Sequence, residues 1–90
     1  MKIRVKLFAV AREAAGAEFI DVDVPSGDVP SGEAAEVSVA ALRQAFLQRL
    51  PSLQFAAKQL LFAVDGDYAT DTTRIDARSE VACIPPVSGG

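Results

Sequence analysis

The chain has 90 residues, of which 50% are hydrophobic and 23% are charged, and this composition is typical of one globular domain rather than of a disordered tail. Lys and Arg number 9 against 12 Asp and Glu, and the formal net charge of −3 argues against a nucleic-acid binder that relies on phosphate contacts. The absence of histidine excludes a His-based triad, a His metal ligand and a His pH switch. Cys83 is the only cysteine, which excludes an internal disulfide and a CxxC site.

The N-terminus and the apolar segments carry no targeting or membrane signal. Residues 1–6 alternate charged with β-branched side chains and lack the continuous apolar core of a signal peptide. The longest apolar runs, such as residues 60–64, are far too short to span a bilayer. We therefore expect a soluble, cytoplasmic protein that binds neither membranes nor nucleic acid.

The first part of the chain predicts two strands joined by a compact connection. Apolar and charged positions alternate in residues 2–8, which is typical of a half-buried strand whose outer face carries charges and, at its end, Phe8. The Ala-rich segment 9–17 indicates a short helical turn or loop. Residues 19–24 alternate again with the β-branched residues inward, and the two strands together predict an N-terminal hairpin.

A loop and a helix follow the hairpin. Residues 25–37 contain two near-identical Pro-Ser-Gly units, which predict an extended surface loop. Ser38 is suited to cap a helix because its hydroxyl can accept from an early helical N–H. Apolar residues then recur at three- and four-residue spacing up to Pro51, which predicts an amphipathic helix that ends there.

The remaining chain returns to strand patterns. We expect a strand at 60–64, a turn at 65–67, a return segment at 68–76 and a last strand at 80–84. Strand pairs on either side of one helix indicate an α+β fold, in which a mixed sheet carries one main helix packed on one face. With the first and last strands parallel in the centre, this arrangement is the β-grasp, or ubiquitin-like, fold.

The C-terminal tail has an organised pattern that most chain ends lack. We expect the β-grasp domain to occupy residues 1–84 and the extended tail to occupy residues 85–90. The tail consists of Pro85, Pro86, Val87, Ser88, Gly89 and Gly90. Its two prolines have no N–H to donate, so they end the last strand and keep the exit extended. Its two glycines have no Cβ, so they can enter a narrow channel.

The terminal carboxylate of Gly90 is the group that stands out as a reaction site. A carboxylate is a poor electrophile, but ATP can convert it to an acyl-adenylate with a good leaving group. Attack by sulfur then leads to a C-terminal thiocarboxylate, and attack by an amine gives an amide. Two terminal glycines alone would be consistent with an idle flexible tail, whereas the strand, the double proline and the Gly-Gly end together favour a reactive one.

Four segments resemble one known family, the small sulfur-carrier subunits of molybdopterin synthase (the MoaD family). The most specific resemblance is the ending, residues 80–90 (EVACIPPVSGG). Residues 7–16 (LFAVAREAAG) resemble that family's first strand and the following turn, residues 39–43 (VAALR) the start of its helix, and residues 61–65 (LFAVD) its third strand. The resemblance covers nearly the whole chain outside the 25–37 loop, and it implies a β-grasp fold.

The resemblance implies a non-catalytic carrier subunit. An E1-like adenylyltransferase (MoeB type) would use ATP to adenylate Gly90, and a sulfurtransferase would supply the sulfur. The tail would insert into the large synthase subunit (MoaE type), within a heterotetramer, where sulfur would pass to cyclic pyranopterin monophosphate and form the molybdopterin dithiolene. Catalytic side chains are then expected on the large subunit, with no cofactor and no metal bound to this chain.

Outside the tail, the resemblance implies a docking surface for these partners, made of three hydrophobic residues and a nearby arginine. These residues are Phe8, Tyr68, Ile84 and Arg12. A second, smaller core is the alternative for the hydrophobic residues, and simple solvation is the alternative for the arginine. Cys83 alternates with the inward Val81, which favours a buried structural thiol over a reactive one. The carboxylates beside Gly66 are interpreted as turn formers rather than as a metal site.

Several functions fit this sequence. The leading hypothesis is the sulfur carrier of molybdopterin synthase, and a related carrier for thiazole or tRNA thiolation is the first alternative. A ubiquitin-like modifier joined to lysines through Gly90 is a second. A plain β-grasp binding module with an idle tail is a third.

Overall fold

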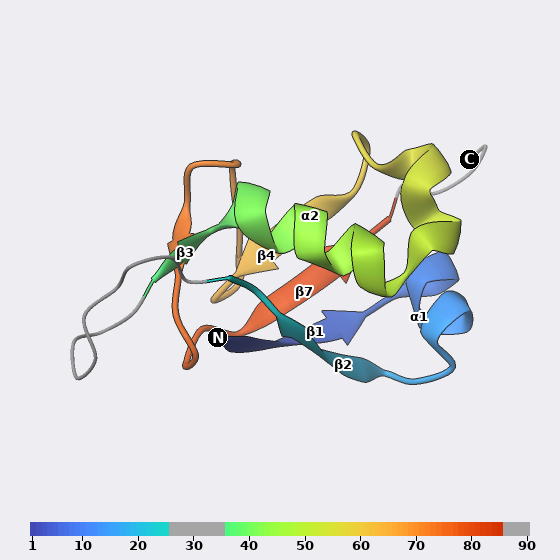
Figure 1. Cartoon of the computed structure of the whole chain (residues 1–90), viewed down its shortest axis with the longest axis horizontal. Coiled ribbons are helices and arrows are strands. Elements are labelled where there is room, and N and C mark those ends of the chain that lie inside the picture. The colour runs from blue at the N-terminus through green and yellow to red at the C-terminus, as the bar shows by residue number, and fades with distance from the viewer. Residues whose placement is uncertain (26–35, 86–90) are drawn as a thin grey trace.

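The computed structural model describes residues 1–25 and 36–85. In chain order the elements are β1 (Lys2–Leu7), α1 (Ala9–Ala15), β2 (Phe19–Asp23), β3 (Val37–Ser38), α2 (Val39–Arg49), the 3-10 helix η1 (Pro51–Ala56), β4 (Leu61–Val64), β5 (Asp67–Tyr68), β6 (Arg74–Ile75) and β7 (Val81–Ile84). Five strands form one sheet in the order β2-β1-β7-β4-β5, and β3 pairs with β6 in a separate two-stranded ladder (Figure 1). Within these described ranges, no helix is long and apolar enough to cross a membrane.

The two central strands of the sheet are the first and the last in the chain. β1 and β7 run parallel, with Val5 opposite Val81, and each pairs on its other side with an antiparallel neighbour. This mixed sheet, crossed on one face by α2, confirms the predicted β-grasp fold (Figure 1). Because β1 and β7 are parallel, both point their carboxyl ends toward the same end of the sheet, where α1 begins.

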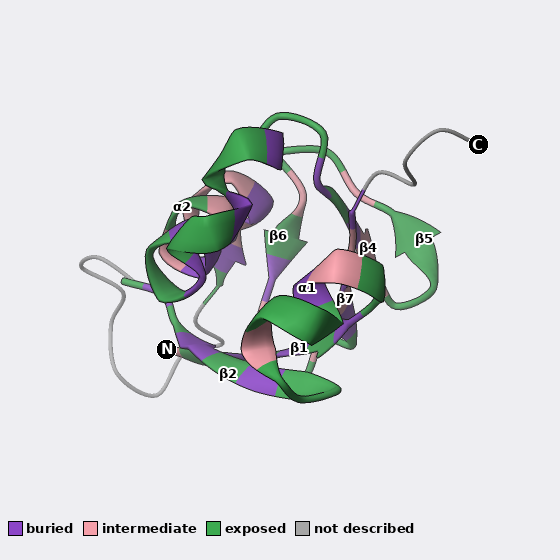
Figure 2. Ribbon diagram, turned by 90° about the vertical axis from the view of Figure 1, so that its right-hand side faces the viewer, coloured by how far each residue is buried: buried purple, intermediate pink, exposed green. Residues whose placement is uncertain are grey.

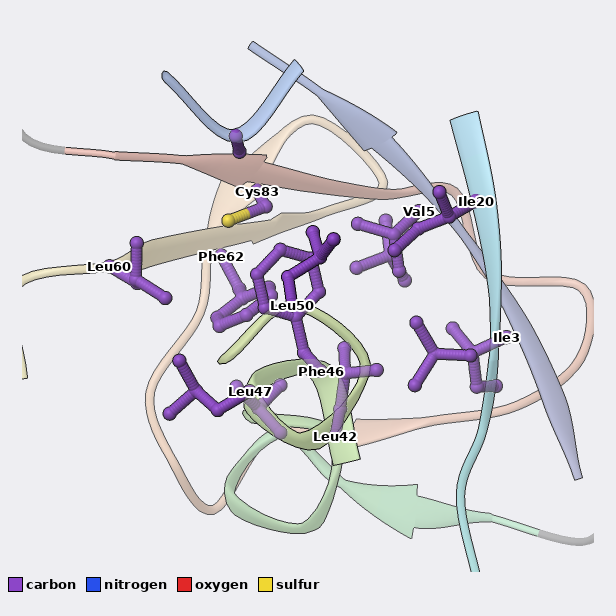
Figure 3. Packing of buried hydrophobic residues seen from close by; sticks show 14 of the residues in the cluster. Ile3, Val5, Ile20, Leu42, Phe46, Leu47, Leu50, Leu60, Phe62 and Cys83 are labelled. Carbon is purple, nitrogen blue, oxygen red and sulfur yellow. The ribbon is translucent and has the colours of Figure 1, made fainter. Parts of the chain in front are cut away.

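The core lies between the sheet and α2, because alternate strand residues point to the helix side. The buried and exposed positions of β1 alternate without a break, and those of β2 do the same. Figure 2 colours the buried positions on the strands and on α2, and the close view in Figure 3 shows the strand residues Ile3, Val5 and Ile20 packed toward the helix. Phe46 of α2 meets Phe62 of β4 edge-to-face, with ring centroids 5.5 Å apart. One continuous apolar cluster therefore joins both layers.

The predicted helix is confirmed at both ends. Ser38 is its N-cap, and the Ser38 hydroxyl accepts a hydrogen bond from the Ala41 N–H at 3.1 Å. The helix ends at Arg49, directly before Leu50 and Pro51. A proline is well suited to the first turn of a helix because its missing N–H would have no partner there. Pro51 accordingly starts η1, a helix that the sequence patterns did not reveal.

Arg43 connects α2 to the chain segments that flank β4. Its guanidinium donates to the carbonyl oxygens of Ala57 at 3.0 Å and Leu60 at 2.6 Å, and to the Asp71 carboxylate at 3.2 Å. The same group lies 5.2 Å from the centroid of the Phe62 ring. One half-buried cation therefore satisfies two carbonyl groups near the end of η1 and also holds the loop between β5 and β6.

The turn predicted at residues 65–67 is a two-residue hairpin between β4 and β5. Val64 pairs with Asp67, and the two intervening residues, Asp65 and Gly66, have φ values of 51° and 89°. Two positive φ angles in a two-residue loop are the signature of a type I′ turn, for which Asp-Gly is favoured. The Asp65 carboxylate also accepts from the Glu80 N–H at 2.9 Å, while the Asp65 N–H donates to the Glu80 carbonyl at 2.8 Å. The interpretation of Asp65 as a turn former is confirmed.

The expected boundaries shift by one residue at four strands, and the two-residue strand β3 is new. The strands predicted at 2–8 and 19–24 end one residue earlier, at Leu7 and Asp23. Those predicted at 60–64 and 80–84 begin one residue later, at Leu61 and Val81. Val37, expected at the end of the 25–37 loop, belongs to β3 and pairs with Ile75 of β6. Residues 26–35 of the expected loop lie outside the described ranges. A strand of two residues has no periodicity, so only its partner strand reveals it.

Candidate functional site

The chain leaves the sheet at the carboxyl end of β7. Ile84 pairs with Leu61 in the last register position between β7 and β4, and the buried Pro85 follows. Because Pro85 has no N–H, the ladder cannot continue past it. The predicted site residues Pro86, Val87, Ser88, Gly89 and Gly90 lie outside the described residues, and their roles stay predictions.

The strand registers build a row of side chains across the sheet face opposite α2, which we call the outer face. Phe19 of β2 lies opposite Lys6 of β1, and Lys6 lies opposite Ala82 of β7. Ala82 in turn lies opposite Ala63 of β4, which lies opposite Tyr68 of β5. Directly opposed residues share one face, so this row places an aromatic ring at each end and two alanines in its middle.

A second row of the outer face lies at the exit of the chain. Two positions further along the strands, the alternation brings Phe8, Ile84 and Leu61 to the same face. Phe8 is 40% exposed and Leu61 is 49% exposed, whereas Ile84 is half-buried between its neighbours. The structure thus places the predicted docking residues Phe8 and Ile84 at the same end of one face, next to the point where Pro85 leads out of the sheet.

The predicted docking residue Tyr68 is 72% exposed, so the alternative of a second small core does not apply to it. Arg12 stands on α1 rather than on a strand, and it forms an ion pair with Glu18 at 3.6 Å. This pair is exposed and contributes little to stability, and a docking role for Arg12 stays a prediction.

Phe8 reaches the outer face through an unusual backbone conformation at the next residue. Ala9 has a φ of 51°, in the left-handed region that non-glycine residues rarely adopt. This conformation turns the chain sharply from β1 into α1, so that Phe8 stays outward while Ala11 is fully buried. The helix ends where Gly16, with a φ of 70°, donates its N–H to the Arg12 carbonyl at 2.9 Å.

Two cations of β1 lie against the aromatic rings of the outer face. The Arg4 guanidinium lies 4.6 Å from the centroid of the Phe19 ring, and the Lys6 ammonium lies 5.3 Å from that of Phe8. Beside them runs a groove of about 510 Å³, with Ala63 and Ala82 in its lining. The outer face therefore combines apolar contact area with charges of both signs, because Asp21 and Asp23 lie opposite Arg4 and Lys2 on the same face. The positive charges are those that lie beside the aromatic rings.

Phe19 and Leu61 belong to this face and were not predicted as site residues. Both could have been found from alternation. Inward Ile20 and Val22 require Phe19 to point outward, and the buried pair Leu60 and Phe62 requires the same of Leu61.

The thiol of Cys83 is part of the core. Its residue is fully buried, and burial raises the pKa of the thiol to about 12, while the positive charge of Arg43 acts in the opposite direction. A thiol that stays protonated and inaccessible at neutral pH is a poor nucleophile. The interpretation of Cys83 as a structural residue is confirmed.

These observations define a class: a ubiquitin-like β-grasp domain with an apolar outer face and an exit from its central strand. Among solved structures, SAMP1 from Haloferax volcanii is similar over the whole length of both chains, with a TM-score of 0.72 and 25% identity. A Pyrococcus furiosus protein, provisionally described as subunit 1 of a molybdopterin converting factor, gives a TM-score of 0.73 at 22% identity and covers 97% of this chain and 99% of its own.

The sequence comparisons place the chain more narrowly. The chain belongs to the ThiS family, whose model matches residues 5–90. It is 32% identical to the molybdopterin synthase sulfur carrier subunit of Arabidopsis thaliana over 90 residues, which is 100% of this chain and 84% of that protein. The corresponding subunit of Caenorhabditis briggsae is 30% identical and is covered over 99% of its length. The resemblance predicted from the sequence is therefore confirmed.

Proposed function

We propose that this protein carries sulfur for molybdopterin synthesis on the carboxyl group of Gly90. The observation that carries the proposal is the match of the ThiS family through residue 90, together with full-length relatives that are molybdopterin synthase sulfur carrier subunits. The fold supports it, because β7 ends in the row that carries Phe8 and Leu61 on the outer face, and Pro85, which has no N–H, ends the pairing of this strand. The proposal requires the tail to act at a site supplied by another protein.

The proposed chemistry has two steps on the terminal carboxylate. A carboxylate oxygen attacks the α-phosphorus of ATP, pyrophosphate leaves, and an acyl-adenylate forms. A sulfur nucleophile delivered by a sulfurtransferase then displaces AMP, which leads to a thiocarboxylate. In the large synthase subunit this sulfur passes to cyclic pyranopterin monophosphate, and the carboxylate is regenerated.

The buried thiol supports the assignment of this chemistry to the tail. A sulfur carrier could hold its cargo either as a cysteine persulfide or as a thiocarboxylate. Cys83 is the only cysteine of the chain, and its side chain is sealed in the core with a raised pKa. Persulfide formation on Cys83 would require the core to open, so the carboxylate is the accessible carrier group.

We further propose that the outer face docks both the E1-like activating enzyme and the large subunit. Phe8, Ile84 and Leu61 lie beside the exit of the tail, so a partner that holds this row also receives the tail. An exposed cluster of large apolar side chains on a small domain is characteristic of an interaction site.

The test is an intact-mass measurement after incubation with an E1-like enzyme, ATP and a sulfur donor. We expect the mass to increase by the replacement of one oxygen by one sulfur. Cys83→Ala should still gain the sulfur, whereas deletion of Gly89 and Gly90 should abolish the gain without unfolding the domain. Sulfur gained by the truncated chain, or lost in Cys83→Ala, would overturn the proposal. Addition of the large subunit and the pterin precursor then separates molybdopterin synthesis from thiazole synthesis or tRNA thiolation.

A second candidate function uses the same activated carboxylate. The similarity to SAMP1, a small archaeal modifier protein, favours conjugation to amines. In that reaction a lysine amine displaces AMP from the adenylate and forms an amide. Ladders of conjugates on other proteins would support the modifier, and sulfur gain without conjugates would support the carrier alone.

A further inference from the structure

Among the described residues, one long edge of the sheet is open along its backbone. There β2 pairs with β1 alone, over five consecutive register positions without a bulge, and it lies at one end of the strand order. The other edge strand, β5, has only two residues. Long unbulged edges are templates for pairing with another chain, which is why many proteins shorten or interrupt them.

The hydrogen-bond phase shows which residues of β2 face outward along this edge. Met1 and Val24 exchange both backbone hydrogen bonds, at 3.0 and 2.8 Å, and the Leu7 N–H donates to the Glu18 carbonyl at 2.7 Å. Bonded pairs alternate in an antiparallel ladder, so Ile20, Val22 and Val24 bond to β1. The N–H and C=O groups of Phe19, Asp21 and Asp23 therefore point away from the sheet, and within residues 1–25 and 36–85 no backbone partner receives them.

The side chains at this edge are acidic and lack ion-pair partners in the described part of the chain. Asp21 lies opposite Arg4, and Asp23 lies opposite Lys2, yet neither carboxylate comes within ion-pair distance of a described cation. Arg4 instead lies over the Phe19 ring at 4.6 Å. The cation that the register offers to Asp21 thus lies over an aromatic ring instead, and both carboxylates are exposed on the outer face of the edge strand.

We propose that the β2 edge is a second docking site, which pairs with an extended segment of another protein that carries Lys or Arg at alternate positions. The backbone of that segment would bond to Phe19, Asp21 and Asp23, and its basic side chains would lie opposite the two carboxylates. Opposite charges in directly opposed strand positions stabilise pairing, and like charges oppose it. The fully overlapped antiparallel pairing of two copies of this chain would place Asp21 against its own copy, so the charge favours a different, basic partner.

This site is separate from the proposed sulfur chemistry, because it involves neither the tail nor ATP. We would therefore test it on the full chain alone, with the synthetic peptide Ac-Lys-Val-Lys-Val-Lys-NH2 as probe and Ac-Glu-Val-Glu-Val-Glu-NH2 as charge-reversed control. Backbone amide shifts and amide exchange are followed by NMR at low salt. We expect fast exchange at Phe19, Asp21 and Asp23 in the free protein, and shift changes with slowed exchange at these residues when the basic peptide is added.

Two variants separate backbone pairing from charge. Asp21→Pro removes an outward N–H that β1 does not use, and proline is tolerated at such edge positions, so the fold should persist while peptide binding is lost. The double variant Asp21→Asn, Asp23→Asn keeps both N–H groups and should weaken binding about two- to thirty-fold, which is the range for two cross-strand charge pairs. Asp67→Asn, on the opposite edge, is the matched control and should change nothing.

Several outcomes would overturn the proposal. These are absence of any perturbation by the basic peptide, perturbation centred on β5 or on the outer-face groove, and equal binding of the acidic peptide. Concentration-dependent shifts at β2 without peptide would show that a second copy of the chain occupies the edge instead. If Asp21→Pro does not fold, undiminished binding in the double asparagine variant is sufficient to refute the proposal.

Discussion

Arg43 provides the sharpest test of how this small domain is held together. Its guanidinium side chain is only 22% exposed and donates to the carbonyl oxygens of Ala57 and Leu60, which belong to the connection between η1 and β4. Replacement by methionine, Arg43→Met, keeps a long apolar stem but removes every donor. The two carbonyl groups then lose a charged partner in a partly buried place, and the loop that carries Asp71 loses its tie to α2.

The loss of unfolding free energy in Arg43→Met follows from the hydrogen-bond acceptors that are left without a donor. Hydrogen bonds to charged groups contribute about 1.5–3 kcal/mol each, and partial access of water to the two carbonyl groups reduces their sum to about 3 kcal/mol. The exposed ion pair with Asp71 adds at most about 1 kcal/mol. For a domain of this size, 3 kcal/mol corresponds to a fall in Tm of about 12–24 °C. Arg43→Lys keeps the charge but not the planar fork, so we expect roughly half of that loss.

The assay is reversible denaturation by urea and by heat, with Asp71→Asn as the control for the ion pair alone. We expect Asp71→Asn to change the free energy of unfolding by less than about 1 kcal/mol, because its carboxylate is mostly exposed. If Arg43→Met unfolds within about 1 kcal/mol of the unmodified protein, or no lower than Asp71→Asn, the carbonyl contacts are not what stabilises this region.

Three further predictions concern the core, the hairpin and the outer face. Burial raises the pKa of the Cys83 thiol from 9.0 to about 12, so the thiol loses its proton at a lower pH in the unfolded chain than in the folded one. The free energy of unfolding is therefore unaffected by this group below pH 9 and falls above pH 9, by up to about 1.4 kcal/mol per pH unit. Urea titrations from pH 8 to pH 11 should show this slope in the unmodified protein and a shallower one in Cys83→Ala. Gly66→Ala should cost about 1 kcal/mol, because φ is 89° there while a Cβ would meet no atom within 4 Å; an unchanged Tm would contradict the left-handed turn. Phe8→Ala should leave stability nearly unchanged but weaken binding to the large subunit by at least about tenfold in a calorimetric titration, and unaltered affinity would remove Phe8 from the docking surface.

The fold was predictable from local patterns where those patterns are long. The alternation in β1 and β2, the capped helix after Ser38 and the Asp-Gly turn each follow from a handful of neighbouring residues. The same alternation places Phe8 on the outer face, and the exposure of Phe19 follows from it as well. Tyr68, on a strand of two residues, was singled out by the family resemblance instead.

The features that could not be predicted depend on contacts far apart in the chain. Arg43 meets Leu60 and Asp71, which are 17 and 28 residues away, and no periodicity in the sequence marks such a contact. The left-handed conformation of Ala9 could not be predicted either, since alanine has no intrinsic preference for a positive φ. The open edge of β2 became visible only when the strand order placed β1 on one side of it and nothing described on the other.

The register of the sheet couples the stability of this domain to its proposed function. Each strand that contributes an inward residue to the core contributes its neighbour to the outer face, as Cys83 and Ile84 do on β7. A slip of one residue would exchange the two faces, burying Lys6 and exposing Leu7. The register that packs the core therefore also determines which residues form the docking surface. Selection for a well-packed core therefore also preserves the outer face and the outward backbone groups of β2, and a substitution that loosens the register is expected to impair docking before it unfolds the chain.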